Sequence, residues 1–539
     1  MYRKNCKITN LFTIVLLVPC FMATDVAASL GSEKTYNFNN AGNYIESNVD
    51  ATDIEQSLAQ LQLNFVENNI PGDTYPSKYA ISGDFNNDNT IDIFSALWSP
   101  KLYFGDGIGA FAPSSFPERA FNAVSADFNN DGHLDIYTVA FGAMQQNYVY
   151  LNNGNGTFNA SIIPGDIGGA TYSASAGDFN HDGNVDLYVT NLSMGGSVGL
   201  NKFYLGDGTG SFTEQVLQSD FYNSTDSAVA DFNNDGNLDL YVTGFDFNGN
   251  GNTNVNSNMV YLGDGQGSFP TSFGHGYLLQ SFAVAAADFN NDGNADIYIA
   301  NGPNQDELYL GDGYGNFINV FLPQVNGFSK DVISKDFNND GNMDLYLACD
   351  GQNKLFFGDG LAGFVAKDIP GDLGQSHGTT SADFNNDGLL DIYVSNDGIV
   401  PGSNPWAYEQ NKLYLSQYSD SRPYVQSIDP FNFTTPIKSF SEVLGPNNEG
   451  EVVYQLSLDN GATWKYYQAG AWLTTTQTNG SEANSAQELN STSLYWLANS
   501  GSVIWRAYLI SDSTQKVEIE KVVISNKIKH KVPPKLPRL

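Results

Sequence analysis

The feature that most constrains the fold is an acidic motif that recurs along the chain, as in DFNNDGNLDLYVT (231–243). Its copies begin at Asp84, Asp127, Asp178, Asp231, Asp288, Asp336 and Asp383, and successive copies start 43 to 57 residues apart. Repeats of this period are typical of arrays of small structural units, because one unit cannot bury its apolar faces alone. We therefore expect seven β-units that pack side by side.

A second motif, a Gly-rich turn between two short strands, follows the acidic motif in six of the repeats. It reads LYFGDGIGAF (102–111), VYLNNGNGTF (149–158), FYLGDGTGSF (203–212), VYLGDGQGSF (260–269), LYLGDGYGNF (308–317) and LFFGDGLAGF (355–364). One strand before the acidic motif, one after it and two around the turn make four strands per repeat. This pattern predicts an all-β fold, a seven-bladed β-propeller over residues 61–418.

The seventh repeat lacks its fourth strand, because no Gly-rich turn follows LYLSQYSD (413–420). Residues 64–85 align without a gap on residues 363–384, which end the sixth repeat and begin the seventh. We therefore expect residues 64–70 to supply the missing strand and to close the ring, which leaves no open array to expose sheet edges. The alternative is an open stack with capped ends.

The acidic motif carries the oxygen donors of a calcium loop. Positions 1, 5 and 9 are Asp and position 3 is Asn in all copies, position 6 is Gly except for Asn89, and position 7 varies. Alternating carboxylate and amide oxygens, with a backbone carbonyl at position 7, form the oxygen cage that Ca²⁺ prefers, whereas Mg²⁺ resists complete dehydration. The alternative is that Asp and Asn only shape turns, but three mutually repelling carboxylates in each of seven loops argue against it.

We predict about seven Ca²⁺ ions. The expected ligands are, at position 1, Asp84, Asp127, Asp178, Asp231, Asp288, Asp336 and Asp383; at position 3, Asn86, Asn129, Asn180, Asn233, Asn290, Asn338 and Asn385; at position 5, Asp88, Asp131, Asp182, Asp235, Asp292, Asp340 and Asp387; at position 7, Thr90, His133, Asn184, Asn237, Asn294, Asn342 and Leu389; and at position 9, Asp92, Asp135, Asp186, Asp239, Asp296, Asp344 and Asp391.

The two motifs together resemble the FG-GAP or VCBS repeats of integrin α-subunit propellers, of related fungal lectins and of many bacterial secreted proteins. The resemblance covers about residues 61–418 and rests on DFNNDGxxDIY and YLGDGxGxF. It implies a seven-bladed propeller with calcium in the hairpin between the first two strands of each blade. It does not imply integrin function, because neither an inserted ligand-binding domain nor a transmembrane helix is recognised in the sequence.

The N-terminal region has the pattern of a signal peptide, predicted at 1–28. Basic residues precede an apolar run at 11–23, which is shorter than a membrane span. Pro19 before Cys20 argues against a lipoprotein signal. Secretion or display on the cell surface is therefore expected, with no transmembrane segment and a monomeric chain. Cys349 is the one cysteine left after cleavage, so no intrachain disulfide is expected.

Outside the repeats, residues 29–60 are predicted to be a linker. Residues 424–526 alternate apolar and polar residues around a turn at Asp459–Gly461 and predict a small β-sandwich that resembles immunoglobulin-like modules. The basic, proline-rich segment 527–539 is expected to be a disordered tail. The formal net charge of −35 excludes recognition of nucleic acid by bulk charge.

The functional prediction is a binding or adhesion module for an extracellular protein or glycan ligand. Aromatic residues on the loops between the second and third strands, on the face opposite the calcium loops, are the candidate ligand contacts. These are Trp98, Phe141, Phe245, Trp406 and Tyr408, with Tyr172 and His377 on neighbouring loops; local packing is the alternative role for each. Two other functions stay open, a lectin and a polysaccharide hydrolase or lyase that uses acids such as Asp246, Asp306 or Asp350.

Overall fold

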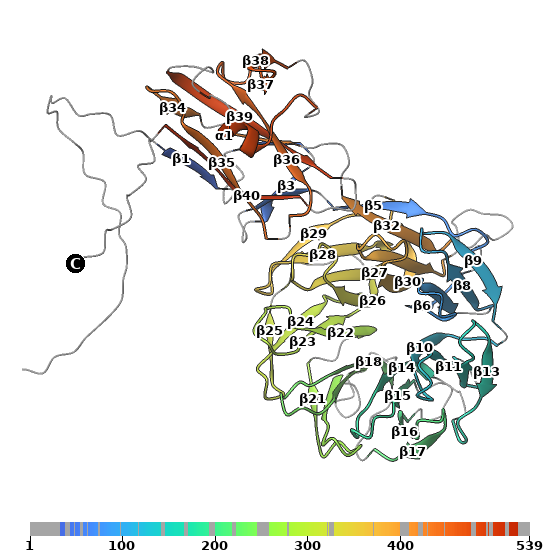
Figure 1. Ribbon diagram of the computed structural model, residues 1–539. Helices are drawn as coiled ribbons and strands as arrows, with labels where there is room; N and C mark the ends of the chain where they lie inside the picture. The colour runs from blue at the N-terminus through green and yellow to red at the C-terminus, as the bar shows by residue number, and fades with distance from the viewer. Residues whose placement is uncertain are drawn as a thin grey trace, which may run out of the picture.

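The computed structural model describes most of the repeat region and parts of the ends. The described residues are 33–37, 44–47, 49–53, 58–61, 63–73, 76–96, 99–116, 118–141, 146–166, 171–192, 200–217, 223–244, 258–276, 280–320, 322, 328–369, 371–398, 409–418, 424–427, 430–446, 448–475, 481–491, 494, 500–511 and 517–526. The predicted signal peptide and basic tail lie outside them. Two β-rich bodies result, a ring and a smaller domain beside it (Figure 1).

Five four-stranded antiparallel sheets follow one another from residue 79 to residue 320. They are β6 (Tyr79–Gly83), β7 (Asp92–Ala96), β8 (Lys101–Gly105) and β9 (Phe111–Ser115); β10 (Asn122–Ala126), β11 (Asp135–Val139), β12 (Tyr148–Asn152) and β13 (Phe158–Ser161); β14 (Thr171–Gly177), β15 (Asp186–Asn191), β16 (Lys202–Gly206) and β17 (Phe212–Gln215); β18 (Ser224–Ala230), β19 (Asp239–Gly244), β20 (Asn258–Leu262) and β21 (Thr271–His275); and β22 (Ala283–Ala287), β23 (Asp296–Ala300), β24 (Glu307–Gly311) and β25 (Phe317–Val320). The chain is therefore all-β in this region, and each sheet corresponds to one repeat.

The last two repeats share an eight-stranded sheet. Its members are β26 (Phe328–Lys335), β27 (Asp344–Gln352), β28 (Lys354–Gly358), β29 (Phe364–Lys367), β30 (Leu373–Ala382), β31 (Asp391–Asn396), β32 (Lys412–Tyr418) and β5 (Leu63–Asn68). The two halves are joined because the end of β27 pairs with the start of β30, at Asp350 and Gln375. β5 comes from the other end of the chain and pairs with β32, with Leu63 opposite Tyr418 and Asn68 opposite Leu413. This is the pairing predicted for residues 64–70.

The first strands of the repeats line the inside of the ring. β6, β10, β14, β18, β22, β26 and β30 contact one another in that order, and β30 contacts β6. The described strands therefore form a closed cycle, a propeller-like arrangement in which blue β5 and β6 lie beside orange β32 and yellow β30 (Figure 1).

Apolar side chains between neighbouring sheets hold the ring together. The second strand of each sheet is buried on both faces, because it is covered by the sheets before and after it. Its central aromatic residue, Phe94 in the first repeat and a Tyr such as Tyr241 or Tyr346 in the others, is fully buried. Position 2 of each acidic motif is a Phe, such as Phe232, that fills the gap under the loop. The loops are thus anchored to the core from below.

The smaller domain consists of two sheets that share one apolar core. Its C-terminal elements are β33 (Tyr424–Ser427), β34 (Phe431–Phe433), β35 (Ser439–Leu444), β36 (Glu451–Ser457), β37 (Lys465–Gln468), β38 (Ala471–Thr474), α1 (Ala486–Ser491), β39 (Gly501–Ile510) and β40 (Glu518–Ser525). Trp505 on β39 and Ile524 on β40 are fully buried in this core. The same apolar cluster continues into the ring through Leu63 and Phe65 of β5.

The linker predicted at 29–60 is wrong, because this segment contributes strands to the smaller domain. They are β1 (Glu33–Asn37), β2 (Tyr44–Ser47), β3 (Val49–Asp53) and β4 (Leu58–Leu61). β1 and β4 pair with β40, and β2 pairs with β33. The predicted domain at 424–526 is therefore incomplete without N-terminal strands. The short strands carry no clear alternation. β3 pairs with β4 nearby, but the partners of β1, β2 and β4 in β33 and β40 lie hundreds of residues away, so no local pattern indicated this pairing.

Among the described residues, no helix is both long and apolar enough to cross a membrane. Cys349 is buried on β27 and is a free thiol.

Candidate metal loops and ligand face

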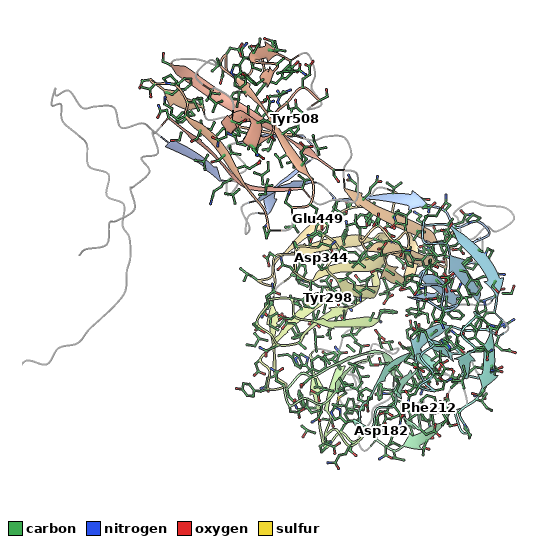
Figure 2. All side chains as sticks on the ribbon, in the orientation of Figure 1. Asp182, Phe212, Tyr298, Asp344, Glu449 and Tyr508 are labelled. Carbon is green, nitrogen blue, oxygen red and sulfur yellow. The ribbon has the colours of Figure 1, made fainter. Side chains whose placement is uncertain are left out.

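Each acidic motif forms the hairpin loop between the first and second strands of its sheet. Figure 2 labels two of the loop carboxylates, Asp182 between β14 and β15 and Asp344 at the start of β27, on opposite sides of the ring. The motif thus places one loop on every repeat, all at the same end of the inner strands.

Within a loop, the side-chain oxygens are held by backbone N–H groups. In the loop that starts at Asp231, the two carboxylate oxygens of Asp231 accept hydrogen bonds from the N–H groups of Asp235 (3.1 Å) and Gly236 (2.8 Å). Asn233 Oδ1 also accepts from Asp235 N (3.0 Å), and Asp235 Oδ1 accepts from Asn237 N (2.9 Å). The Asp and Asn oxygens at positions 1, 3 and 5 are therefore turned into the loop.

Position 6 needs a left-handed backbone, which explains the residue found there. Gly236 has φ +89°, and Asn89 in the first loop adopts φ +67°. Asn tolerates this conformation better than other non-Gly residues. Asn89 N still donates to Asp84 Oδ2 (2.9 Å), so the first loop keeps the geometry of the others.

The Asp at position 9 is buried under the loop. Asp239 is completely buried and accepts hydrogen bonds from Phe232 N (2.9 Å) and Gly263 N (2.7 Å). Its pKa is raised to about 6, mainly because the carboxyl is buried; the two N–H groups lower this pKa, and the neighbouring carboxylates of Asp235 and Asp231 raise it. Position 9 of the other loops shows the same raised pKa, up to about 8 at Asp344. Each loop therefore concentrates negative charge that a cation would neutralise.

The donor set fits a hard cation when all donor types are counted. In the described part of the chain, no three His, Cys, Asp or Glu side chains converge closely enough to hold an ion by themselves. Each loop adds to its carboxylates the Asn oxygen at position 3 and the carbonyl at position 7, and such mixed oxygen sets are what Ca²⁺ accepts.

Positions 4 and 7 connect neighbouring loops, a role that the sequence analysis missed. Position 4 has a left-handed backbone, with φ +56° at Asn234, and its side chain leaves its own loop. Asn234 Nδ2 donates to Asn294 Oδ1 at position 7 of the next loop (2.7 Å). Equivalent contacts join Asn87 to His133, Asn130 to Asn184, His181 to Asn237 and Asn291 to Asn342. Position 7 therefore does more than offer a backbone carbonyl.

The Gly-rich turn closes over these inter-loop contacts. A Cβ atom on Gly313 would lie 2.4 Å from Asn234 Nδ2 and 2.4 Å from Asn294 Oδ1. Any side chain at this position would collide with the pair, which explains the second Gly of the GDG turn. Gly315 of the same turn donates its N–H to the Phe232 carbonyl of the preceding loop (3.0 Å).

The seventh repeat lacks both the Gly-rich turn and a polar side chain at position 7, which agrees with a role of the turn in covering the inter-loop contact. It lacks the Gly-rich turn, and its position 7 is Leu389, which is buried. Asn339 Nδ2 of the sixth loop donates instead to the Gly388 carbonyl (3.4 Å). At the closing contact of the ring, Asn386 lies beside Thr90 and Gly107 of the first repeat.

A second feature missed in the sequence is a buried Asp in the segment before three of the first strands. Asp73, Asp166 and Asp372 each follow Ile-Pro-Gly. Asp372 accepts hydrogen bonds from the Tyr346 hydroxyl (2.6 Å) and from Asn353 Nδ2 (2.7 Å). Burial raises the pKa of Asp372, while these hydrogen bonds lower it. The recurrence of the sequence IPGD in three repeats could have indicated that this Asp has a structural role.

Replacing this Asp should destabilise the ring. Asp372→Ala leaves the buried Tyr346 hydroxyl and Asn353 amide without their partner, at an expected cost of about 3 kcal/mol. The matched control is Asp368→Ala, because Asp368 is exposed and pairs only with Lys354 at the surface, at an expected cost below about 1 kcal/mol. Urea denaturation measures both. Equal losses would mean that the buried network does not stabilise the ring.

The candidate ligand contacts fall into two groups. Trp98, Phe245, Trp406 and Tyr408 lie outside the described residues. The others pack against the inner strands: Phe141 stacks on Phe121 with ring centroids 4.9 Å apart, Tyr172 is buried beside them, and the His377 ring lies 5.1 Å from the Tyr79 ring. Phe141, Tyr172 and His377 therefore belong to a local aromatic cluster, the alternative role considered for them.

The carboxylates considered for catalysis have structural partners where the structure describes them. Asp306 is buried and accepts hydrogen bonds from the Tyr298 hydroxyl (2.9 Å) and the Ser329 hydroxyl (2.8 Å). Asp350 forms an ion pair with Lys330 (2.6 Å). Asp246 lies outside the described residues. Asp306 and Asp350 therefore have roles in the fold that need no substrate.

The comparisons with known proteins agree with the repeat geometry. A family model described as FG-GAP-like repeat matches residues 84–138, 127–189, 192–242 and 336–394. The chain contains FG-GAP-like repeats. These matches span six of the seven acidic loops, and the repeat at 288–296 has the same loop geometry as the matched ones.

Similar solved structures include two crystal structures of BBS1N in complex with ARL6DN, one soaked with mercury and one with lead. Sequence identity is 11% and 10%, the matches cover 65% and 66% of this chain and 96% of the other, and the TM-score is 0.43 for both. No curated protein matches the chain.

Proposed function

We propose that this protein is a secreted or cell-surface binding module built on a seven-bladed β-propeller that holds about seven Ca²⁺ ions. The closed cycle of inner strands supports seven blades, with β5 as the last strand of the seventh. The smaller domain is proposed to be an immunoglobulin-like β-sandwich completed by β1 to β4.

One observation carries the calcium proposal. In every loop a buried Asp at position 9 lies within electrostatic range of the carboxylates at positions 5 and 1, as Asp239 does with Asp235 and Asp231. A buried carboxylate beside two others, repeated around the ring, is costly unless a cation binds. Oxygen-only donors favour Ca²⁺ over Mg²⁺, because Mg²⁺ resists complete dehydration. The proposed ligands are those predicted at positions 1, 3, 5, 7 and 9.

The proposed ligand is an extracellular protein or glycan that binds the face opposite the calcium loops. FG-GAP-like repeats form propeller modules that are often used in binding and adhesion. The connections between second and third strands on that face vary in length and carry Trp406 and Tyr408. Loops of variable length on a rigid scaffold are where binding residues concentrate.

A binding screen with two kinds of variant tests this proposal. The calcium-loaded protein is applied to a glycan array and to immobilised extracellular proteins, and its strongest hit becomes the probe. Trp406→Ala or Tyr408→Ala should weaken binding at least tenfold with an unchanged melting temperature. Asp231→Ala should lower the melting temperature while the protein that remains folded binds normally. If Asp231→Ala abolishes binding in a folded protein and the aromatic variants bind normally, the ligand lies on the calcium face and the proposal is wrong.

A further inference from the structure

Seven contacts run around the ring from each calcium loop to the next. Five join position 4 of one loop to the side chain at position 7 of the next, and one ends on a backbone carbonyl. At the seventh, Asn386 packs against Gly107 of the first repeat. We call this set of contacts the inter-loop girdle. It connects loops that belong to different repeats.

Both ends of each girdle contact lie next to proposed calcium ligands. Asn234 stands between Asn233 and Asp235, which are ligands of its own loop. Its partner Asn294 offers its carbonyl to the ion of the next loop, and Asn294 N donates to the ligand Asp292 (2.9 Å). An ion in either loop therefore restrains a residue whose side chain is hydrogen-bonded to the other loop.

The girdle contacts lie at the surface, and the Gly-rich turns pack closely against them. Gly313 covers the Asn234–Asn294 pair so closely that no Cβ fits, and the Gly315 N–H holds the Phe232 carbonyl in the preceding loop. A displacement of the loop at Asp231 must therefore move the turn and the loop of the next repeat. Sites that share such an element restrict each other's freedom.

We propose that the inter-loop girdle couples the calcium loops, so that calcium loads the ring cooperatively. This inference rests on the proposed calcium function. An ion fixes the backbone of one loop and thereby orders the girdle residue between two ligands of its neighbour. The second ion then meets a loop with less conformational entropy to lose, and it binds more tightly. By linkage, each site raises the affinity of the other by the same factor.

A double variant can separate one loop from its neighbours without changing that loop. Asn234→Gly removes the donor that reaches Asn294, and glycine keeps the left-handed backbone of position 4. Asn342→Ala removes the partner of Asn291. The loop at 288–296 then keeps its own sequence but loses its side-chain contacts with both neighbours. The control is Gln266→Ala with Leu361→Ala, because both residues are exposed at the tips of Gly-rich turns in the flanking repeats.

Native mass spectrometry at half-saturating calcium measures the distribution of bound ions. The wild type and the control should show mainly empty and fully loaded chains. The double variant should accumulate a species with one ion fewer than the full complement, whose last site binds about fivefold more weakly. The single variant Asn234→Gly should show a smaller change in the same direction.

The outcomes distinguish the coupling from the calcium function. If the wild type binds calcium but its ions follow the distribution expected for independent sites, or if the double variant loads like the wild type, the coupling is refuted and the calcium function stands. If the wild type retains no calcium, both are refuted. Circular dichroism of the calcium-saturated double variant establishes that it is folded; if it is not, the single variant decides.

Discussion

Removing calcium with a chelator is expected to lower the melting temperature of the ring by at least about 10 °C. Each ion that binds only the folded state adds about 2.7 kcal/mol to the free energy of unfolding when the calcium concentration exceeds its Kd a hundredfold. The ring is proposed to have about seven such sites. Without the ions, the buried Asp239 and its counterparts face their neighbouring carboxylates uncompensated. Differential scanning calorimetry with and without EDTA, at constant ionic strength, measures the shift.

The smaller domain provides an internal control for this experiment. It contains none of the acidic loops, and Trp464 and Trp505 in its core report its unfolding by fluorescence. EDTA should lower the melting temperature of the smaller domain far less than that of the ring. Added magnesium should not restore the melting temperature of the ring. A decrease of less than about 2 °C in the melting temperature of the ring in EDTA would contradict the calcium proposal.

Replacing the closing strand should have the second large effect. We expect a Gly-Ser segment of equal length in place of Leu63–Asn68 to cost more than about 5 kcal/mol, because it removes the pairing with β32 and the burial of Leu63 and Phe65. The same replacement of Ala471–Thr474, a mostly exposed edge strand of the smaller domain, should cost much less. Chemical denaturation followed by circular dichroism compares the two.

Two point variants refine the test of the closing strand. Phe65 and Val66 are neighbours on opposite faces of β5, with 8% and 48% of their surfaces exposed. Phe65→Ala should cost about 3 kcal/mol and Val66→Ala less than about 1 kcal/mol. If the strand replacement in the ring is no more harmful than the one in the smaller domain, β5 does not hold the ring closed.

Much of the ring could be predicted from the sequence because the seven repeats can be aligned with one another. The strands around each acidic motif are where alternation and Gly-rich turns place them, and the gapless match of residues 64–85 to residues 363–384 identified β5. The prediction failed for strands outside the repeats that pair with distant parts of the chain. β1 is hydrogen-bonded to β40 at the other end of the chain, and no local pattern in its five residues reveals that partner.

The contacts between repeats were also beyond the sequence analysis. The Asn234 side chain meets its partner Asn294 60 residues later, and only the geometry of adjacent loops brings the two together. A signal was nevertheless present. The one repeat without a Gly-rich turn is also the one with Leu389 at position 7, so the turn and position 7 vary together. A left-handed backbone alone is enough to explain Asn at position 4. The sequence therefore gave no separate indication that this side chain also binds the next loop.

The central claim is that the acidic loops are calcium sites, and counting the ions tests it most directly. The protein is dialysed against calcium, freed of loose metal by gel filtration, and analysed for metal and protein content in the same sample. The account predicts about seven Ca²⁺ ions per chain and no comparable amount of magnesium when both metals are supplied. Two or fewer calcium ions per folded chain would contradict it.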